Sequence, residues 1–201
     1  MDRTLRYYAE NAKAFMMDSR DADLRMIRER FLKELQPGTA ILDFGCGSGR
    51  DTKAFLERGY HVTAIDGSPE LCRLASAYTG IPVRQMLFTE LSDVKTYDGI
   101  WACASILHVP SAELPKVFRR LIAALKPGGV MYASFKYGTF EGDRNGRWFT
   151  DFTEEKFTAF LKQFPELTIK DQWISADVRP GRENEQWLNV ILRMSQVTCF
   201  V

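Results

Sequence analysis

Three closely spaced glycines follow a short apolar run near the start of the chain, in the segment ILDFGCGSGRD (residues 41–51). The glycines are Gly45, Gly47 and Gly49. Glycines at such a bend leave no side chain between the backbone and a ligand. A helix that begins directly after them presents free N–H groups and the positive end of its dipole. This pattern predicts a binding loop for an anionic or oxygen-rich group.

The loop differs from the two common phosphate-binding motifs. A dinucleotide loop has the pattern G-x-G-x-x-G and a P-loop requires Gly-Lys-Ser/Thr, whereas here Arg50 follows the third glycine. Asp43 lies two residues before the loop, where a carboxylate repels a diphosphate and attracts an ammonium or sulfonium group. S-adenosylmethionine carries both cations and a carboxylate. Asp66 ends the next apolar run, where a carboxylate accepts hydrogen bonds from ribose hydroxyls. Together these residues predict an S-adenosylmethionine site.

Apolar runs alternate with helical patterns along the chain, which is typical of a parallel α/β sheet. Strands are expected at residues 40–44, 61–66, 83–86, 99–103 and 130–135. Two further β-like runs, 167–175 and 186–194, have no helix between them and are expected to pair antiparallel. We predict one domain: a helical cap (1–36), a cofactor-binding core (37–135), and a region (136–201) with a mobile lid loop, a helix and an antiparallel hairpin.

Four segments together resemble the class I S-adenosylmethionine-dependent methyltransferases. They are DFGCGSG (43–49), HVTAIDGSP (61–69), YDGIW (97–101) and LKPGG (125–129). The resemblance covers about residues 7–164 and implies a Rossmann-like, doubly wound α/β sheet of seven mostly parallel strands with an antiparallel last strand. The phrases YYAENA, ASILHVP, SFKYG and RWFTDF are similar to the branch containing bacterial tellurite-resistance-type methyltransferases.

Cofactor contacts are expected from the matched motifs and the segments beside them. After the third strand the family often has an acid that contacts adenine, but Met86-Leu-Phe-Thr89 stands there, so adenine is expected on apolar side chains and backbone groups. Arg50 is expected at the methionine carboxylate or a substrate anion. The full set expected at the cofactor is Tyr8, Asp43, Gly45, Cys46, Gly47, Gly49, Arg50, Asp66, Gly67, Ser68, Leu87, Phe88 and Cys103.

Methyl transfer from a sulfonium requires an aligned acceptor and exclusion of water, and requires a base only where the nucleophile is protonated. His108, just beyond the fourth expected strand, is the candidate catalytic base, with a structural histidine as the alternative. Acceptor contacts are expected from Tyr7, Asn11, His108, Lys136, Arg147, Phe149, Arg182 and Trp187. The tyrosines equally suit core packing. Arginines among aromatic side chains predict a small acceptor that is anionic or planar.

Composition argues against several other classes of protein. The 201 residues carry a formal net charge of +1, which gives no electrostatic footprint for nucleic acid or an anionic membrane. The four cysteines form no CxxC pair, so neither a metal site nor a disulfide framework is expected. The same cysteine spacing predicts a cytoplasmic location. No signal peptide is expected, and no run approaches the roughly 20 apolar residues of a membrane span.

Two other functions remain open from the sequence. A non-catalytic module that binds S-adenosylmethionine and regulates a partner would have the same glycine loop. An NAD-dependent oxidoreductase would share the sheet and Asp66, although its loop would differ. A small-molecule methyltransferase is preferred, because the chain also lacks the N/D-P-P-Y/F motif of amino-methylating nucleic-acid enzymes. The oligomeric state is not predicted.

Overall fold

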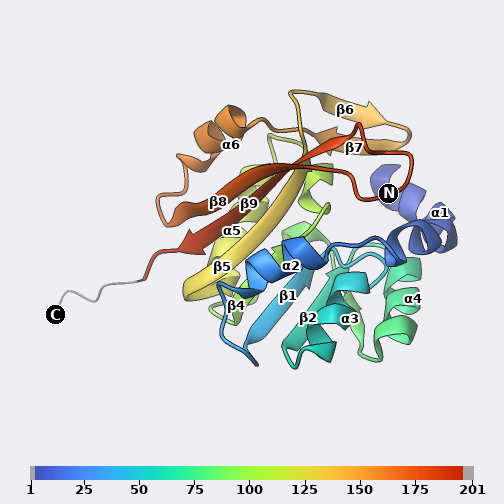
Figure 1. The fold of residues 1–201 in the computed structure, drawn as a ribbon, viewed down its shortest axis with the longest axis horizontal. Helices are drawn as coiled ribbons and strands as arrows, with labels where there is room; N and C mark the ends of the chain where they lie inside the picture. The colour runs from blue at the N-terminus through green and yellow to red at the C-terminus, as the bar shows by residue number, and fades with distance from the viewer. Residues whose placement is uncertain (1–2, 197–201) are drawn as a thin grey trace.

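The computed structural model describes residues 3–196, in which seven strands form one sheet of order β3-β2-β1-β4-β5-β9-β8 (Figure 1). The strands are β1 (Ala40–Phe44), β2 (His61–Asp66), β3 (Val83–Gln85), β4 (Tyr97–Ala102), β5 (Leu125–Lys136), β8 (Leu167–Ala176) and β9 (Gln186–Met194). The first five pair in parallel, and β9 pairs antiparallel with both β5 and β8. The predicted seven-stranded α/β sheet with an antiparallel last strand is confirmed.

Helices cover both faces of the sheet, as in other doubly wound folds. They are α1 (Arg3–Arg20), α2 (Arg25–Leu32), α3 (Arg50–Glu57), α4 (Pro69–Thr79), α5 (Leu114–Ala124) and α6 (Glu154–Leu161), with short 3₁₀ helices η1 (Phe88–Glu90) and η2 (Ile106–His108). On one face, Phe31 of α2 and Phe55 of α3 pack with Trp101 and Tyr132 of the sheet. On the other face, α5 and α6 pack on the sheet through a second apolar cluster.

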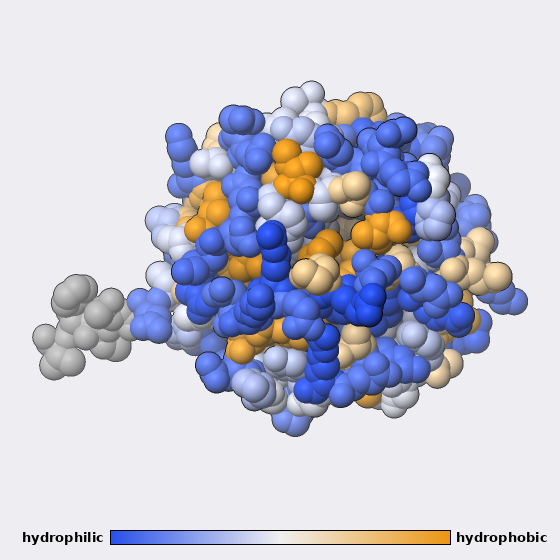
Figure 2. Space-filling model, in the orientation of Figure 1, coloured by the Kyte–Doolittle hydropathy of each residue, from blue (hydrophilic) through white to orange (hydrophobic). Residues whose placement is uncertain are grey.

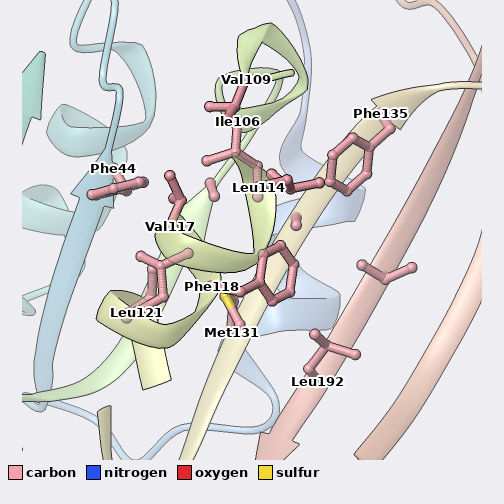
Figure 3. Close-up of a cluster of buried hydrophobic side chains, with 14 of the residues drawn as sticks. Phe44, Ile106, Val109, Leu114, Val117, Phe118, Leu121, Met131, Phe135 and Leu192 are labelled. Carbon is pink, nitrogen blue, oxygen red and sulfur yellow. The ribbon is translucent and has the colours of Figure 1, made fainter. Parts of the chain in front are cut away.

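The larger core lies under α5, whose apolar residues recur at helical spacing. Val117, Phe118 and Leu121 are fully buried in one cluster with Met131 of β5 and Leu192 of β9, and the Phe118 ring lies beside Met131 (Figure 3). Each such side chain contributes about 1.5–3 kcal/mol relative to an exposed one. This packing holds β4, β5 and β9 as a rigid base for the loops at their ends.

A β-hairpin occupies the segment predicted from the sequence as a mobile lid loop, so the expectation of an irregular loop is wrong, while the role of the segment as a lid stays a prediction. Strands β6 (Glu141–Arg144) and β7 (Arg147–Thr150) pair antiparallel around Asn145 and Gly146, which have φ of 54° and 80°. Asn-Gly with positive φ at both residues is the preferred two-residue hairpin turn. Phe149 and Thr150 are buried, which anchors the hairpin on the domain. The high glycine and charge content of the segment favoured the prediction of a loop, although the Asn-Gly pair indicates a hairpin turn.

The predicted N-terminal cap consists of α1 and α2. Helix α1 lies between α4 and the β6–β7 hairpin (Figure 1) and contacts α4 and β7. The hairpin is fastened to it, because the Trp148 N–H donates to Thr4 Oγ1 at 3.0 Å. No helix within residues 3–196 combines the length and apolar character that a membrane crossing requires.

Candidate functional site

A pocket of about 1040 Å³ lies at the carboxyl ends of the parallel strands, under α1, the β6–β7 hairpin and the loop between β8 and β9. Most residues predicted at the site line it: Tyr8, Asp43, Gly45, Cys46, Gly47, Arg50, Asp66, Gly67, Leu87, Phe88, Cys103, His108, Lys136, Arg147, Phe149, Arg182 and Trp187. Four others, Tyr7, Asn11, Gly49 and Ser68, are not among its lining residues. The pocket is continuous from the glycine loop to the hairpin.

The glycine loop adopts a backbone that other residues disfavour. Gly45 and Gly47 have φ of +85° and +54°, in the left-handed region. A Cβ on Gly45 would lie 2.5 Å from Ser105 Cβ, and one on Gly47 would lie 3.0 Å from the Phe15 ring. Gly49 instead precedes α3 and faces α4, where a Cβ would meet Thr79 at 2.7 Å. The first two glycines thus shape the pocket wall, and the third permits helix packing.

Asp66 fixes the shape of the loop through both carboxylate oxygens. One accepts from the Gly47 N–H and the other from the Ser68 N–H, each at 2.9 Å. Ser68 in turn caps α4 by accepting from the Leu71 N–H. Burial raises the pKa of Asp66, while these backbone donors oppose that effect. Asp66 therefore orders the loop, and its contact with a ribose stays a prediction.

Asp43 lines the pocket as a buried carboxyl group. Its Oδ2 accepts from Thr52 Oγ1 at 2.5 Å. Burial, with a further contribution from the negative charge of Asp51, raises the pKa of Asp43 to about 7. The group is therefore close to half protonated at neutral pH, and a cation beside it would favour the ionised form.

A buried ion network holds Arg50 in place, and most of its members were not predicted from the sequence. Asp51 accepts from Arg28 Nη1 at 2.7 Å, from Arg50 Nη2 at 2.6 Å and from Trp101 Nε1 at 3.0 Å. Although burial opposes ionisation, the two guanidinium groups lower the pKa of Asp51. Arg50 also donates to the Ser19 carbonyl of α1 at 3.1 Å. Arg28 precedes the loop by some twenty residues and has no local motif, so spacing gave no signal for it.

His108 has both ring nitrogens occupied. Its Nδ1 lies 2.6 Å from the Trp148 carbonyl oxygen, which can only accept, so Nδ1 carries the proton. Its Nε2 lies 2.8 Å from the Tyr8 hydroxyl and accepts from it. Burial, with a contribution from Arg147, lowers the pKa of His108 to about 4. The ring is therefore neutral at pH 7 and points at Tyr8.

The part of the pocket beside the loop between β8 and β9 is rich in ion pairs. Asp177 accepts from Trp187 Nε1 at 3.0 Å and from Lys136 Nζ at 3.2 Å, and Arg179 also binds it. Arg179 reaches Asp18 of α1 at 3.4 Å, which ties the loop between β8 and β9 to that helix. Lys136 and Trp187, both predicted to contact the acceptor, thus donate hydrogen bonds to the same carboxylate, that of Asp177.

Cys46 lies within the glycine loop and Cys103 directly follows β4, and both are neutral thiols. Burial raises the pKa of Cys103 to about 12 and raises that of Cys46 well above its usual range. Ser105, which sequence analysis did not select, has a buried hydroxyl with no hydrogen-bond partner in the described chain, and it lies against Gly45. A ligand oxygen or nitrogen is the natural partner for such a hydroxyl.

The central part of the chain is similar to known methyltransferases. Residues 41–129 match the model of a family described as a methyltransferase domain. The chain is similar to a ubiquinone biosynthesis O-methyltransferase of Xanthomonas campestris pv. campestris, with 30% identity over 105 residues, which cover 49% of this chain and 43% of the relative. It is also similar to the 18S rRNA (guanine(1575)-N(7))-methyltransferase of Saccharomyces cerevisiae, with 31% identity over 122 residues, which cover 54% and 44%. The chain thus spans less than half the length of these relatives.

A solved structure extends the likeness in fold over nearly the whole chain. It is the 1,6-didemethyltoxoflavin-N1-methyltransferase of Burkholderia thailandensis, with a TM-score of 0.75, 24% identity, and coverage of 94% of this chain and 85% of that one. Residues 41–129 are therefore similar to a methyltransferase domain, and the whole sheet shares the fold of this solved structure.

Proposed function

We propose that the chain transfers a methyl group from S-adenosylmethionine to a small-molecule acceptor. The observation that carries this proposal is the acid-flanked glycine loop, which opens into a continuous pocket of about 1040 Å³. This volume lies at the upper end of the range of about 300 to 1,000 Å³ for small-molecule pockets, and its lining reaches from the glycine loop to the β6–β7 hairpin. A pocket open beyond the cofactor loop favours an enzyme over a module that only binds the cofactor.

The residues present fit the cofactor. The Gly45 and Gly47 backbone forms a cradle that a Cβ would fill, and the buried Ser105 hydroxyl lacks a partner in residues 3–196. Asp43 would face the ammonium or sulfonium group, and Leu87 and Phe88 would hold adenine by apolar contact. When bound, S-adenosylmethionine supplies a methyl group already activated on sulfur. The chain's task is to orient the acceptor and exclude water.

Tyr8 and His108 act as a pair in this proposal. Neutral His108 accepts from the Tyr8 hydroxyl and so fixes where the Tyr8 oxygen lies in the pocket. Because Nε2 is occupied by Tyr8, His108 is a positioning residue and Tyr8 is the group that touches the acceptor. A histidine with a pKa near 4 is a weak base at neutral pH, which favours a nucleophile that is already ionised or soft.

The proposed enzyme branch, class of acceptor and cellular location are supported by features of the sequence. The four phrases given above support the branch of tellurite-resistance-type enzymes, and the balanced charge of +1 supports a small acceptor instead of a nucleic acid. Figure 2 shows a largely hydrophilic face with small, separate apolar patches, which gives no support for a broad apolar docking surface on that side. Cysteine spacing supports a cytoplasmic location.

The test is a screen of candidate acceptors with detection of S-adenosylhomocysteine. The purified chain is incubated with S-adenosylmethionine and a library of oxygen, nitrogen, sulfur and metalloid nucleophiles, and active acceptors are repeated with the variants His108→Ala and Arg147→Ala. At least one acceptor is expected to yield enzyme-dependent S-adenosylhomocysteine, with lower turnover in both variants. If the chain binds the cofactor but never forms this product, the assignment as an enzyme is wrong.

A further inference from the structure

Arg147 of β7 differs from the other cationic side chains in the pocket. The other five each lie within 4.0 Å of a carboxylate: Arg50 with Asp51, Lys136 with Asp177 and Glu185, Arg144 with Asp151, Arg179 with Asp177, and Arg182 with Asp18. Arg147 also lines the pocket, but in the part of the chain that the structure describes it has no carboxylate within that distance. Its charge is therefore uncompensated.

Aromatic rings surround the Arg147 guanidinium. Its central carbon lies 4.5 Å from the Tyr7 ring centroid, 5.3 Å from that of Phe149 and 5.8 Å from that of Tyr8. Its hydrogen bond to the Tyr8 hydroxyl is long, at 3.5 Å, and its buried Nε has no partner in the described residues. Arg147 is half-buried, so its guanidinium is held by the rings while some of its N–H donors have no protein acceptor. An acceptor oxygen brought by a ligand would satisfy it.

We infer that Arg147 binds the carboxylate of a planar aromatic acceptor, an inference that rests on the proposed function. A guanidinium pairs with a carboxylate through two parallel hydrogen bonds, so the charge and the geometry both match. The flat walls formed by Phe149 and Tyr8 suit a ring that carries the carboxylate. Leu107 and Val109, on either side of His108, add apolar side chains to the pocket lining.

Two aromatic side chains, Tyr8 and Phe15, connect Arg147 with the glycine loop. Tyr8 packs edge-on against Phe15, with ring centroids 5.0 Å apart, and the Phe15 ring lies beside Gly47. A single aromatic acceptor held by Arg147 would therefore lie alongside Tyr8 and extend toward the methyl donor. The lowered pKa of His108, to which Arg147 contributes, agrees with a site that accepts an anion and does not need a strong base.

The test compares charged and neutral probes of the same shape. Binding of benzoate and 4-hydroxybenzoate is compared with that of benzamide and 4-hydroxybenzamide by calorimetry, using the full chain saturated with S-adenosylhomocysteine. Charge-assisted hydrogen bonds predict that each carboxylate binds at least about 10-fold more tightly than its amide. In Arg147→Met the preference is expected to fall below about threefold. Arg144→Gln is the matched control, because Arg144 is cross-strand from Arg147 but paired with Asp151, and it is expected to keep the preference.

The outcomes separate this inference from the proposed function. A chain that binds S-adenosylhomocysteine but shows no preference for the carboxylates, or none that Arg147→Met removes, overturns the inference alone. A chain that fails to bind S-adenosylhomocysteine overturns the proposed function first. Circular dichroism and cofactor affinity of Arg147→Met, both expected at wild-type values, distinguish loss of the anion site from loss of the fold.

Discussion

The protonation of Asp43 should control cofactor affinity. Its pKa of about 7 means that near pH 6 roughly a tenth of the molecules carry the carboxylate, whereas at pH 7.5 about three quarters do. A cationic ligand binds the ionised form, so affinity for S-adenosylmethionine should rise about 8-fold between these two values. The affinity rises with pH because binding of the cation releases the Asp43 proton, and a higher pH favours that release. His108, with a pKa near 4, stays neutral throughout this range.

Asp43→Asn isolates this effect, because asparagine keeps an oxygen that can accept from Thr52. The variant should lose the pH dependence and bind S-adenosylmethionine about 10- to 100-fold more weakly at pH 7.5, as expected for a lost charge-assisted contact. Calorimetry in two buffers of different ionisation enthalpy measures affinity and proton release together. A variant with the same pH profile as the unmodified chain would show that Asp43 does not face the cation.

Three further predictions concern the loop and the Tyr8–His108 pair. Gly45→Ala should unfold with about 1–3 kcal/mol less stability than Gly59→Ala, because both glycines have positive φ (+85° and +81°) but only Gly45 faces Ser105 closely; urea unfolding measures the difference, and equal losses would contradict it. Tyr8→Phe should lower kcat/KM at least about 10-fold with cofactor affinity nearly unchanged; steady-state kinetics that match the unmodified chain would refute the role of Tyr8. His108 binds a proton more readily when unfolded, so stability should fall by about 2–3 kcal/mol between pH 7 and pH 4.5 relative to His108→Gln; parallel unfolding curves for the two proteins would count against its buried neutral state.

Local patterns in the sequence were sufficient to predict the sheet and the loop. Continuous apolar runs predicted β1, β2 and β4, and the absence of a helix between residues 175 and 186 predicted the antiparallel pairing of β8 and β9. Ser68 and Pro69 predicted the start of α4, which the hydrogen bond from the Leu71 N–H to Ser68 Oγ confirms. These features depend on residues close together in sequence, where spacing carries the information.

Long-range contacts could not be predicted in this way. The network of Arg28, Asp51 and Trp101 joins three elements that only the fold brings together. His108 was selected by residue type, but its partners Tyr8 and the Trp148 carbonyl come from distant segments. The β6–β7 hairpin was not predicted for a different reason. Its Asn-Gly turn is a local pattern, but the charge and glycine content of the segment favoured a loop.

Calorimetric titration with S-adenosylmethionine, S-adenosylhomocysteine and NADH tests the central claim most directly. The bend formed by Gly45 and Gly47 beside Asp43 should bind the two adenosyl compounds and reject the dinucleotide, since its carboxylate opposes a diphosphate. Binding of both adenosyl compounds without NADH is the predicted result. Binding of NADH with no heat from S-adenosylmethionine would contradict the account.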